Sequence, residues 1–169
     1  YLPLQLPNAA SLQRTDAVCR EVEKILAGTP GVRVYNTVVG FSLLSTVYAT
    51  YNAFFFVTFE PWDERTAAEQ QYGAIKAHIN RELAKLPEAV AFAFPPPAIP
   101  GVGTAGGVTF MLQDRSGGDV AYLAENTRRF IGEARKRPEI ASVTTPFVAD
   151  VPQPFADVGR DKVLKQGVA

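Results

Sequence analysis

Residues 89–107 read AVAFAFPPPAIPGVGTAGG, and this stretch divides the chain into two halves. Val90, Phe92 and Phe94 alternate with alanine, so a strand here carries bulky side chains on one face and almost nothing on the other. The prolines that follow end β pairing, because proline lacks a backbone donor and fixes φ. The glycines after them restore backbone freedom. We interpret the stretch either as an interdomain linker or as a mobile loop beside a ligand cleft.

The composition limits the classes of protein to which the chain can belong. Its 169 residues can hold one domain or two small ones, and 17 basic residues balance 17 acidic ones. The one basic cluster, 135–137, is typical of a solvated helix end, so we expect no nucleic-acid partner. One cysteine and one histidine argue against disulfides, ordinary zinc sites and histidine-dependent catalysis. We therefore expect that the chain is not an enzyme and that it binds no metal ion or cofactor.

Neither end of the sequence has the features of a natural terminus. We find no signal peptide and no apolar run of about eighteen residues that would span a membrane. The chain begins inside a strand-like stretch at Tyr1 and stops just after Gly167. We therefore expect it to be cut from a longer protein.

Apolar spacing in the first half predicts strand, helix, strand, strand, helix and strand. The expected strands are 1–6, 32–39, 53–60 and 89–94, and the expected helices are 11–28 and 67–86. Ser11 is the expected N-cap of the first helix, and Thr66 with Glu69 has capping-box spacing before the second. Residues 40–52 have no consistent period and predict a long loop. This order is that of the split β-α-β, ferredoxin-like plan, with both helices on one face of the sheet.

The second half repeats the first in part. Adding 108 to Ser11 gives Asp119, another expected helix cap, and adding 108 to Val32 gives Ile140, another expected strand start. The expected strands here are 108–113, 140–144 and 155–158, and the expected helices begin at 119 and 161. The sequence thus predicts an α+β fold of two ferredoxin-like subdomains in tandem, the second incomplete. The divisions are 1–97, a Pro/Gly hinge at 98–107, and 108–169.

Three stretches are candidates for ligand contact, and each also has a purely structural interpretation. The 40–52 loop is apolar, so its side chains either contact a ligand or are buried beneath the loop. Alternation places Phe54 and Phe56 on one face of a strand and the 55, 57 and 59 side chains on the other, where we expect core. Phe92 and Phe94 are either core or an aromatic wall. GVGTAGG, residues 101–107, precedes a strand and not a helix, which is the wrong context for a phosphate-binding loop.

Four motifs in this order resemble one known family. They are WDER (62–65), VAFAFPPPAIPGVGTAGG (90–107), LQDRSGGD (112–119) and DVGRDKVLKQGV (157–168). Together they resemble the periplasmic porter region, in the C-terminal half, of resistance-nodulation-division multidrug efflux transporters of the hydrophobe/amphiphile branch, typified by the acriflavine-resistance pump. The resemblance implies that 1–97 is the first porter subdomain of that half. Residues from about 100 onward then form the opening part of the second, up to the insertion of a docking domain.

The resemblance also implies roles for particular residues. Phe56 with Val38 falls at a distal drug pocket, Phe92 and Phe94 fall at a proximal one, and the stretch from Gly40 matches the switch loop between them. The implied substrate contacts are Val38, Phe41, Leu43, Phe56, Phe92, Phe94 and Pro96, and the implied gating residues are Gly40, Ser42, Leu44, Ser45, Thr46, Gly101, Gly103 and Thr104. Four positions depart from the family pattern: Leu43 replaces a frequent phenylalanine, Thr46 a frequent arginine, Gly101 an acidic residue and Thr144 an arginine.

The partners implied by the resemblance are those of the whole pump. A family member is a homotrimer with a periplasmic adaptor and an outer-membrane channel, and it expels hydrophobic or amphiphilic drugs, detergents and dyes by using proton flow through membrane helices. This chain would be a periplasmic portion of such a bacterial inner-membrane protein, without those helices. The alternative is a stand-alone ferredoxin-like module that pairs a sheet edge with another protein.

Overall fold

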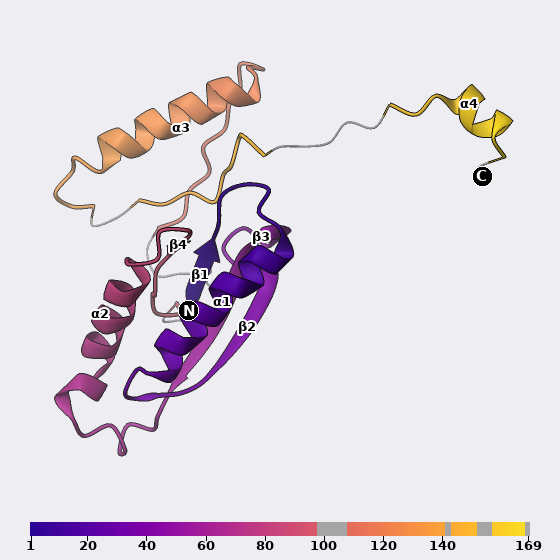
Figure 1. Ribbon diagram of the computed structural model, residues 1–169. Coiled ribbons are helices and arrows are strands. Elements are labelled where there is room, and N and C mark those ends of the chain that lie inside the picture. The colour runs from indigo at the N-terminus through magenta and orange to yellow at the C-terminus, as the bar shows by residue number, and fades with distance from the viewer. Residues whose placement is uncertain (98–107, 141–142, 152–156, 168–169) are drawn as a thin grey trace.

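A computed structural model describes residues 1–97, 108–140, 143–151 and 157–167 (Figure 1). The elements are β1 (Leu2–Gln5), α1 (Leu12–Ala27), β2 (Val32–Ser42), β3 (Val47–Phe59), the short 3-10 helix η1 (Ala68–Gln70), α2 (Tyr72–Leu83), β4 (Val90–Ala91), α3 (Val120–Ala134) and α4 (Arg160–Lys165). The chain is therefore α+β, and the predicted order of strands and helices in the first half is confirmed.

The four strands form one antiparallel sheet in the order β2-β3-β1-β4. β3 therefore lies between the two strands that α1 connects. α1 packs on β2 and β3, and α2 packs on β4 and touches α1. Figure 1 shows both helices on the same side of the sheet, as the single apolar stripe of each helix predicts.

The core lies between this sheet and its two helices. Phe55 of β3 and Leu2 and Leu4 of β1 are fully or almost fully buried there, against Val22 of α1 and Ile75 of α2. Each such side chain contributes about 1.5–3 kcal/mol through removal of apolar surface from water. Val57 and Phe59 pack against the same core, so the expectation that the 55, 57 and 59 side chains form the core face is confirmed.

α1 begins and ends where the sequence predicts. Ser11 Oγ accepts from the backbone N–H of Arg14 (3.2 Å), and Gly28 closes the last turn with its N–H on Lys24 O (3.0 Å). The buried Thr15 donates its hydroxyl to Thr50 O at 2.7 Å. This bond ties the first turn of α1 to β3 and leaves no unpaired hydroxyl at this position in the core.

The predicted start of the second helix is wrong by several residues. The capping-box spacing of Thr66 and Glu69 placed it at 67, but η1 comes first and α2 begins at Tyr72. The local bond that forms is different: Ala67 N–H donates to Gln70 Oε1 (3.3 Å). The backbone is extended at Gln71, with φ −73° and ψ 147°, so a single helix cannot pass through this point.

A buried arginine explains this break. Arg65 is 5 % exposed and donates to Glu60 O (2.8 Å) and to Gln70 O (3.2 Å), while its own carbonyl accepts from the Gln71 amide (2.7 Å). Its guanidinium lies 4.7 Å from the ring centroid of Trp62. These bonds fold the connection back on itself, and the buried Arg65 side chain overrides the helix preference of the segment.

The predicted long loop over 40–52 is a β-hairpin. β2 continues to Ser42, β3 starts at Val47, and Phe41 pairs with Tyr48. We call residues 41–48 the hairpin tip. The register slips at its base, where the single residue Gly40 of β2 spans the same length as residues 49–52 of β3. Such an irregularity hides the strand period from sequence inspection.

Two contacts explain the slip. Gly40 has φ +83°, and a Cβ there would lie 3.2 Å from Leu12 Cδ1 of α1, so the position needs glycine. Residues 49–52 are held by other elements: Tyr51 O accepts from Leu6 N (2.9 Å), and Thr50 Oγ1 donates to Ala10 O (2.7 Å). β3 therefore follows β1 and α1 here and not β2.

The strand predicted at 89–94 is longer than the one observed, since β4 contains only Val90 and Ala91. Pairing with β1 nevertheless continues, since Phe94 N donates to Tyr1 O (3.0 Å) and Tyr1 N donates to Phe94 O (3.1 Å). Pro95 then ends the pairing, as expected of a residue without a backbone donor.

The second half contains the predicted helices but not the predicted strand at 108–113. Asp119 caps α3 by accepting from Tyr122 N (2.7 Å), and α4 runs close to the predicted range. Residues 108–113 belong to no ladder; a strand needs a neighbour to accept its hydrogen bonds, and none of the described strands lies beside this segment. Residues 140, 143, 144, 157 and 158 are also outside any strand. The rest of the strands predicted at 140–144 and 155–158 lies outside the described residues.

One turn supports the internal repeat. Val32 N donates to Thr29 O (3.2 Å), and the same bond occurs 108 residues later, from Ile140 N to Arg137 O (3.1 Å). The first turn leads into β2. The second follows α3 in the same way, so the two halves share a helix, its cap and the turn after it.

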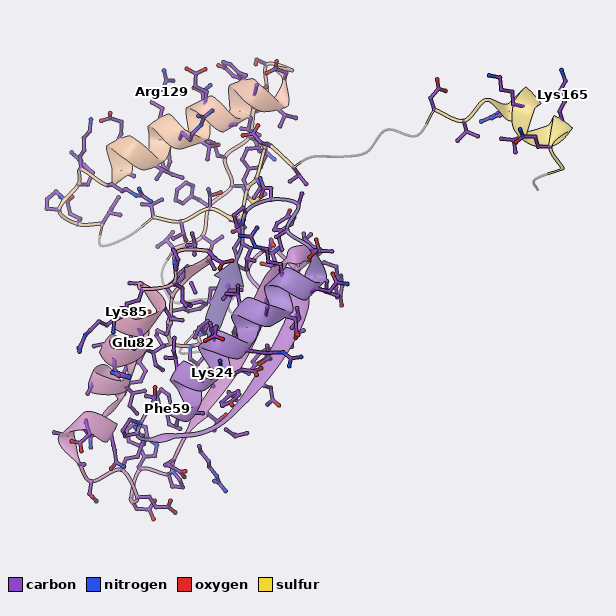
Figure 2. The ribbon with its side chains drawn as sticks, viewed as in Figure 1. Lys24, Phe59, Glu82, Lys85, Arg129 and Lys165 are labelled. Carbon is purple, nitrogen blue, oxygen red and sulfur yellow. The ribbon has the colours of Figure 1, made fainter. Side chains whose placement is uncertain are left out.

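Most of the described ion pairs join residues three or four apart at the helices, and they do not decide the fold. Lys24 pairs with Glu21 on α1 (2.7 Å), and Lys85, just after α2, pairs with Glu82 of α2 (2.6 Å). All four side chains are exposed or partly exposed, and Figure 2 labels Lys24, Glu82 and Lys85. Such pairs contribute about 0–1 kcal/mol each.

We expect Phe55→Ala to lower the free energy of unfolding of the first half by about 3–5 kcal/mol, because it leaves a cavity in the core. The matched control is Phe110→Ala, at a phenylalanine that is 57 % exposed. Urea titrations followed by far-ultraviolet circular dichroism measure both variants. Equal losses for the two would contradict the placement of the core.

We expect Gly40→Ala to destabilise the hairpin by about 1–2 kcal/mol, because alanine is strained at a positive φ. Thr46 is the comparison: it has φ +55°, so Thr46→Gly relieves strain and should be neutral or stabilising. Hydrogen exchange of the hairpin amides checks both changes. Greater protection in Gly40→Ala than in the parent chain would refute the assignment.

Candidate ligand-binding face

The face of the sheet opposite the helices carries two rows of large side chains. Phe54 of β3 is paired with Val38 of β2 on one side and with Pro3 of β1 on the other. In the next row Phe56 is paired with Asn36. Directly opposed residues in a ladder share a face, so these side chains lie next to one another.

β1 and the segment after β4 complete the rows. Tyr1 lies two residues before Pro3 and therefore on the same face, and its two hydrogen bonds with Phe94 place that phenylalanine directly across from it. Phe92 then lies across from Pro3 in the same register as the pair Leu4 and Ala91. The first row is therefore Val38, Phe54, Pro3 and Phe92, and the second is Asn36, Phe56, Tyr1 and Phe94.

Five aromatic rings from these rows form one contiguous cluster, which we call the aromatic face. Its members are Tyr1, Phe54, Phe56, Phe92 and Phe94. The ring centroids lie 5.5 Å apart for Tyr1 and Phe54, 5.6 Å for Tyr1 and Phe56, 6.0 Å for Tyr1 and Phe94, 5.0 Å for Phe54 and Phe56, and 5.7 Å for Phe92 and Phe94. Most of these contacts are edge-to-face, a geometry that contributes about 0.5–1.5 kcal/mol per pair beyond area burial.

The aromatic face combines a buried centre with accessible borders. Phe54 is fully buried, whereas Tyr1, Phe56, Phe92 and Phe94 are half-buried. The ladder neighbours on its borders carry amides and not charges: Asn36 lies beside Phe56, and Gln5 pairs with Asn52 in the row next to Phe54. The arrangement offers apolar area with a few neutral hydrogen-bonding groups, which suits contact with apolar or amphiphilic molecules.

Four of the seven predicted contact residues share one face of the sheet, and three lie outside that face, one of them beside Phe94. Val38, Phe56, Phe92 and Phe94 all lie on the face opposite the helices. Phe41 is at the hairpin tip, where its ring is 5.1 Å from that of Tyr48. Leu43 lies in the hairpin turn, and Pro96 lines a cavity of about 240 Å³ together with Phe94 and residues of β3 and α2.

The predicted gating residues divide between the hairpin and an undescribed stretch. Gly40 and Ser42 belong to β2, and Leu44, Ser45 and Thr46 lie in the turn of the hairpin. Ser42 Oγ accepts from Ser45 N at 3.4 Å, and Thr46 has a positive φ. Gly101, Gly103 and Thr104 lie outside the described residues.

Sequence reasoning missed Tyr1 and Pro3 as members of this face, and it did not decide the role of Phe54. The alternation of Phe54 with Phe56 was a usable signal, because the two side chains share a face by the strand period. Tyr1 gave no such signal. Its neighbours Phe56 and Phe94 are 55 and 93 residues away along the chain, and only the register of three strands brings them together.

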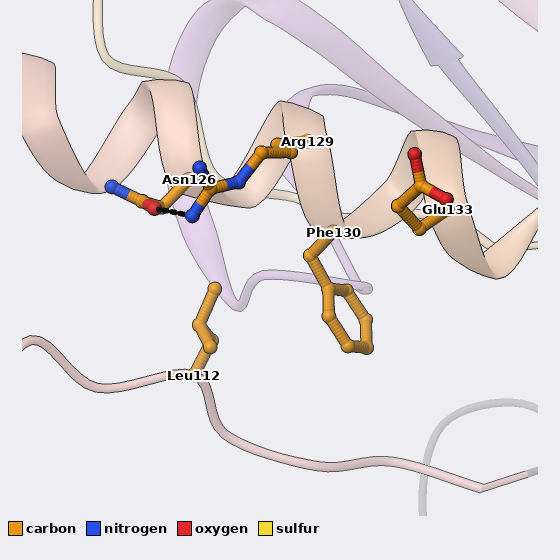
Figure 3. A pocket seen from close by; sticks show the side chains of 5 residues that line it. All are labelled: Leu112, Asn126, Arg129, Phe130 and Glu133. Atoms are coloured by element: carbon orange, nitrogen blue, oxygen red, sulfur yellow. Dashed lines mark hydrogen bonds between the residues drawn. The ribbon is translucent and has the colours of Figure 1, made fainter.

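A second cavity, of about 530 Å³, lies between α3 and the segment before it (Figure 3). It is lined by Leu112, Asn126, Arg129, Phe130 and Glu133, and Arg129 donates to Asn126 Oδ1 at 2.8 Å. Phe130 is 41 % exposed, and Ala124 is the one buried residue of α3. The cavity is thus an open concavity beside an apolar stripe that is only partly covered.

The one cysteine is not placed for catalysis. Cys19 is buried in α1, and burial together with the nearby Glu23 and Asp16 carboxylates raises the pKa of its thiol to about 12. Within the described ranges, no group of three or more His, Cys, Asp or Glu side chains is close enough to hold a metal ion. No helix in those ranges has both the length and the apolar character needed to cross a membrane.

Comparison with known proteins identifies the family. The model of the AcrB/AcrD/AcrF family matches residues 1–169, and the chain belongs to that family. The resemblance seen in the sequence motifs is thereby confirmed.

Several relatives in this family are named as export proteins or efflux pumps. The chain is 31 % identical over 163 residues to the solvent-resistant pump membrane transporter SrpB of Pseudomonas putida, an alignment that covers 95 % of this chain and 15 % of SrpB. It is 30 % identical over 169 residues to the multidrug export protein AcrF of Escherichia coli (98 % and 16 %), and 28 % identical over 170 residues to the toluene efflux pump membrane transporter TtgB of Pseudomonas putida (99 % and 16 %). The chain therefore spans 15–16 % of the length of these relatives.

We expect the Cys19 thiol to resist alkylation by iodoacetamide at pH 8 in the native chain and to react fully in denaturant, because the neutral thiol is favoured by burial. The raised pKa also means that the unfolded thiol loses its proton at a lower pH than the folded one, so stability falls as the pH rises above about 9. A Cys19→Ala variant should lack this part of the pH dependence. Rapid native labelling would show that packing of α1 on the sheet does not bury the thiol.

Proposed function

We propose that the chain is part of the substrate-binding porter region of a proton-driven resistance-nodulation-division multidrug efflux pump, on the periplasmic side of the inner membrane. The observation that carries the proposal is the aromatic face, which joins Phe56 to Phe92 and Phe94 through Tyr1 in a chain of the AcrB/AcrD/AcrF family. The family match along all 169 residues favours this function over the alternative of an unrelated stand-alone interaction module.

In this proposal residues 1–97 form a ferredoxin-like porter subdomain. The order of elements and the sheet order β2-β3-β1-β4 support it, because β3 lies between β1 and β2 as in a split β-α-β unit. Residues 98–107 form the hinge, and residues 108–169 begin a second subdomain of the same plan. The turn shared by residues 29–32 and 137–140 supports the tandem arrangement.

The aromatic face would serve two drug pockets at once. Phe56 and Val38 contribute to the distal pocket, and Phe92, Phe94 and Pro96 contribute to the proximal one. Tyr1 lies between them, 5.6 Å from Phe56 and 6.0 Å from Phe94 by ring centroids. A ligand therefore moves between the two pockets along continuous aromatic surface and does not need to cross a polar barrier.

The hairpin tip would act as the switch between these pockets. It carries Phe41 and Leu43 as contacts and Ser42, Leu44, Ser45 and Thr46 as gating residues, with the gating residue Gly40 at its base, and its register differs from that of the main sheet. Because the register slips at Gly40, the hairpin tip can keep its own pairing of Phe41 with Tyr48 while the backbone at its base changes conformation. Gly101, Gly103 and Thr104 complete the gate in this proposal.

The chemistry of the face sets the expected selectivity. Binding to aromatic rings depends on apolar area and shape, and a site with few fixed hydrogen bonds accepts many ligands with modest affinity. The substrates are therefore hydrophobic or amphiphilic drugs, detergents, dyes and solvents. In the whole protein we propose a homotrimer that works with a periplasmic adaptor and an outer-membrane channel.

We expect Phe56→Ala and Phe94→Ala, made in the complete transporter, to lower resistance to bulky apolar drugs and solvents. Loss of one aromatic contact removes about 1 kcal/mol, roughly fivefold in ligand affinity. The control is Trp62→Ala, at an aromatic residue that is 82 % exposed and outside the aromatic face. Susceptibility assays at matched expression levels measure the effect. Unchanged profiles for both phenylalanine variants would refute the pocket assignment.

A further inference from the structure

We infer that Asn80 of α2 is a positioning residue for the aromatic face: its side-chain amide holds the main chain of Ala93 and thereby fixes Phe92 and Phe94. This inference rests on the binding function proposed for that face. Asn80 is not itself a member of the aromatic face, and it acts through the backbone alone.

The contact between Asn80 and Ala93 is a double hydrogen bond. Ala93 N donates to Asn80 Oδ1 at 2.6 Å, and Asn80 Nδ2 donates to Ala93 O at 3.3 Å. One side chain thus satisfies both the donor and the acceptor of a single residue. This is the pattern that a neighbouring strand provides in an antiparallel ladder, and a primary amide is the side-chain group that reproduces it.

The contact matters because of the directions in which the N–H and C=O groups of Ala93 and Phe94 point. Phe94 uses its N–H and C=O on Tyr1 of β1. In an antiparallel strand the groups of successive residues point to opposite sides, so those of Ala93 point away from β1, toward the outer edge of the sheet. Asn80 therefore occupies the place of a missing fifth strand at one position.

The segment depends on these two attachments. Regular pairing of β4 ends at Ala91, and Pro95 cannot continue it. Between these limits the described backbone bonds of the segment go to Tyr1 on one side and to Asn80 on the other. Because Phe92 and Phe94 flank Ala93, a shift of its main chain moves both rings relative to Tyr1.

The helix that carries Asn80 is itself well anchored. Its neighbours Ile79 and Leu83 are 2 % and 1 % exposed and belong to the core. Ala93 packs against that core with a small side chain, which lets α2 approach closely enough for the amide to reach. The position of Phe92 and Phe94 in the aromatic face is thus set by α2, which is anchored in the core.

The first experiment compares Asn80→Ala with the unchanged 169-residue chain and with Asn126→Ala. Asn126 is a helical asparagine whose Nδ2 bonds locally to Tyr122 O, so its loss controls for removal of a helix amide. We expect the Ala93 amide to exchange at least about tenfold faster in Asn80→Ala only, because a protected donor becomes open to solvent. We expect binding of the fluorescent probe N-phenyl-1-naphthylamine to weaken about fivefold, which corresponds to loss of one net hydrogen bond in positioning.

The second experiment uses Asn80→Asp and pH. An ionised carboxylate still accepts from Ala93 N but cannot donate to Ala93 O, whereas a protonated carboxyl can do both. We expect this variant to bind the probe weakly at pH 7 and to recover as the pH falls through about 4, the ordinary pKa of such a carboxyl. The unchanged chain at the same pH values should show no such recovery, and a purely structural loss would not be reversed by protonation.

The outcomes separate this inference from the proposed function. Unchanged Ala93 exchange in Asn80→Ala, or absence of acid recovery in Asn80→Asp, would overturn the role of Asn80. If the unchanged chain does not bind the probe, the proposed binding function of the isolated face fails, and the exchange of Ala93 still decides whether Asn80 holds the segment.

Discussion

The whole arrangement depends on β3, a central strand with large side chains on both faces. Phe55, Val57 and Phe59 face the helices and form the core, while Phe54 and Phe56 face the other way and form the middle of the aromatic face. The period of two makes these roles inseparable, because a slip of one residue would exchange the two sets. Core packing therefore fixes the position of the aromatic face.

The borders of the sheet are held by specific residues where regular pairing stops. Gly40 lets the hairpin tip leave the register of the sheet, and Asn80 bonds the main chain of Ala93 where a further strand would lie. Arg65 ties the connection between β3 and α2 through three hydrogen bonds. Asn80 and Arg65 bond backbone groups near the ends of strands, where the ladder does not satisfy them.

The second half shows what a supersecondary unit looks like when little packs against it. α3 has its own cap and is followed by the same turn as α1, so these local interactions are present in both halves. Its apolar stripe is only partly covered: Val120 and Phe130 are exposed, and Phe130 lies with Leu112 beside an open cavity. Helices close their hydrogen bonds within one segment, whereas strands need a neighbour, which explains why α3 forms and the 108–113 strand does not.

The sequence alone determined the features that depend on near neighbours: the Ser11 and Asp119 caps, the order of strands and helices up to the prolines, the two faces of β3, and the family motifs. It could not determine the hairpin at 41–48, the late start of α2 or the membership of Tyr1 in the aromatic face. Those depend on register, on the buried Arg65 and on strands that are distant in sequence. Local patterns report which side of an element is apolar, but only the folded sheet decides which residues meet across it, because cross-strand contacts join positions whose separation carries no periodic signal.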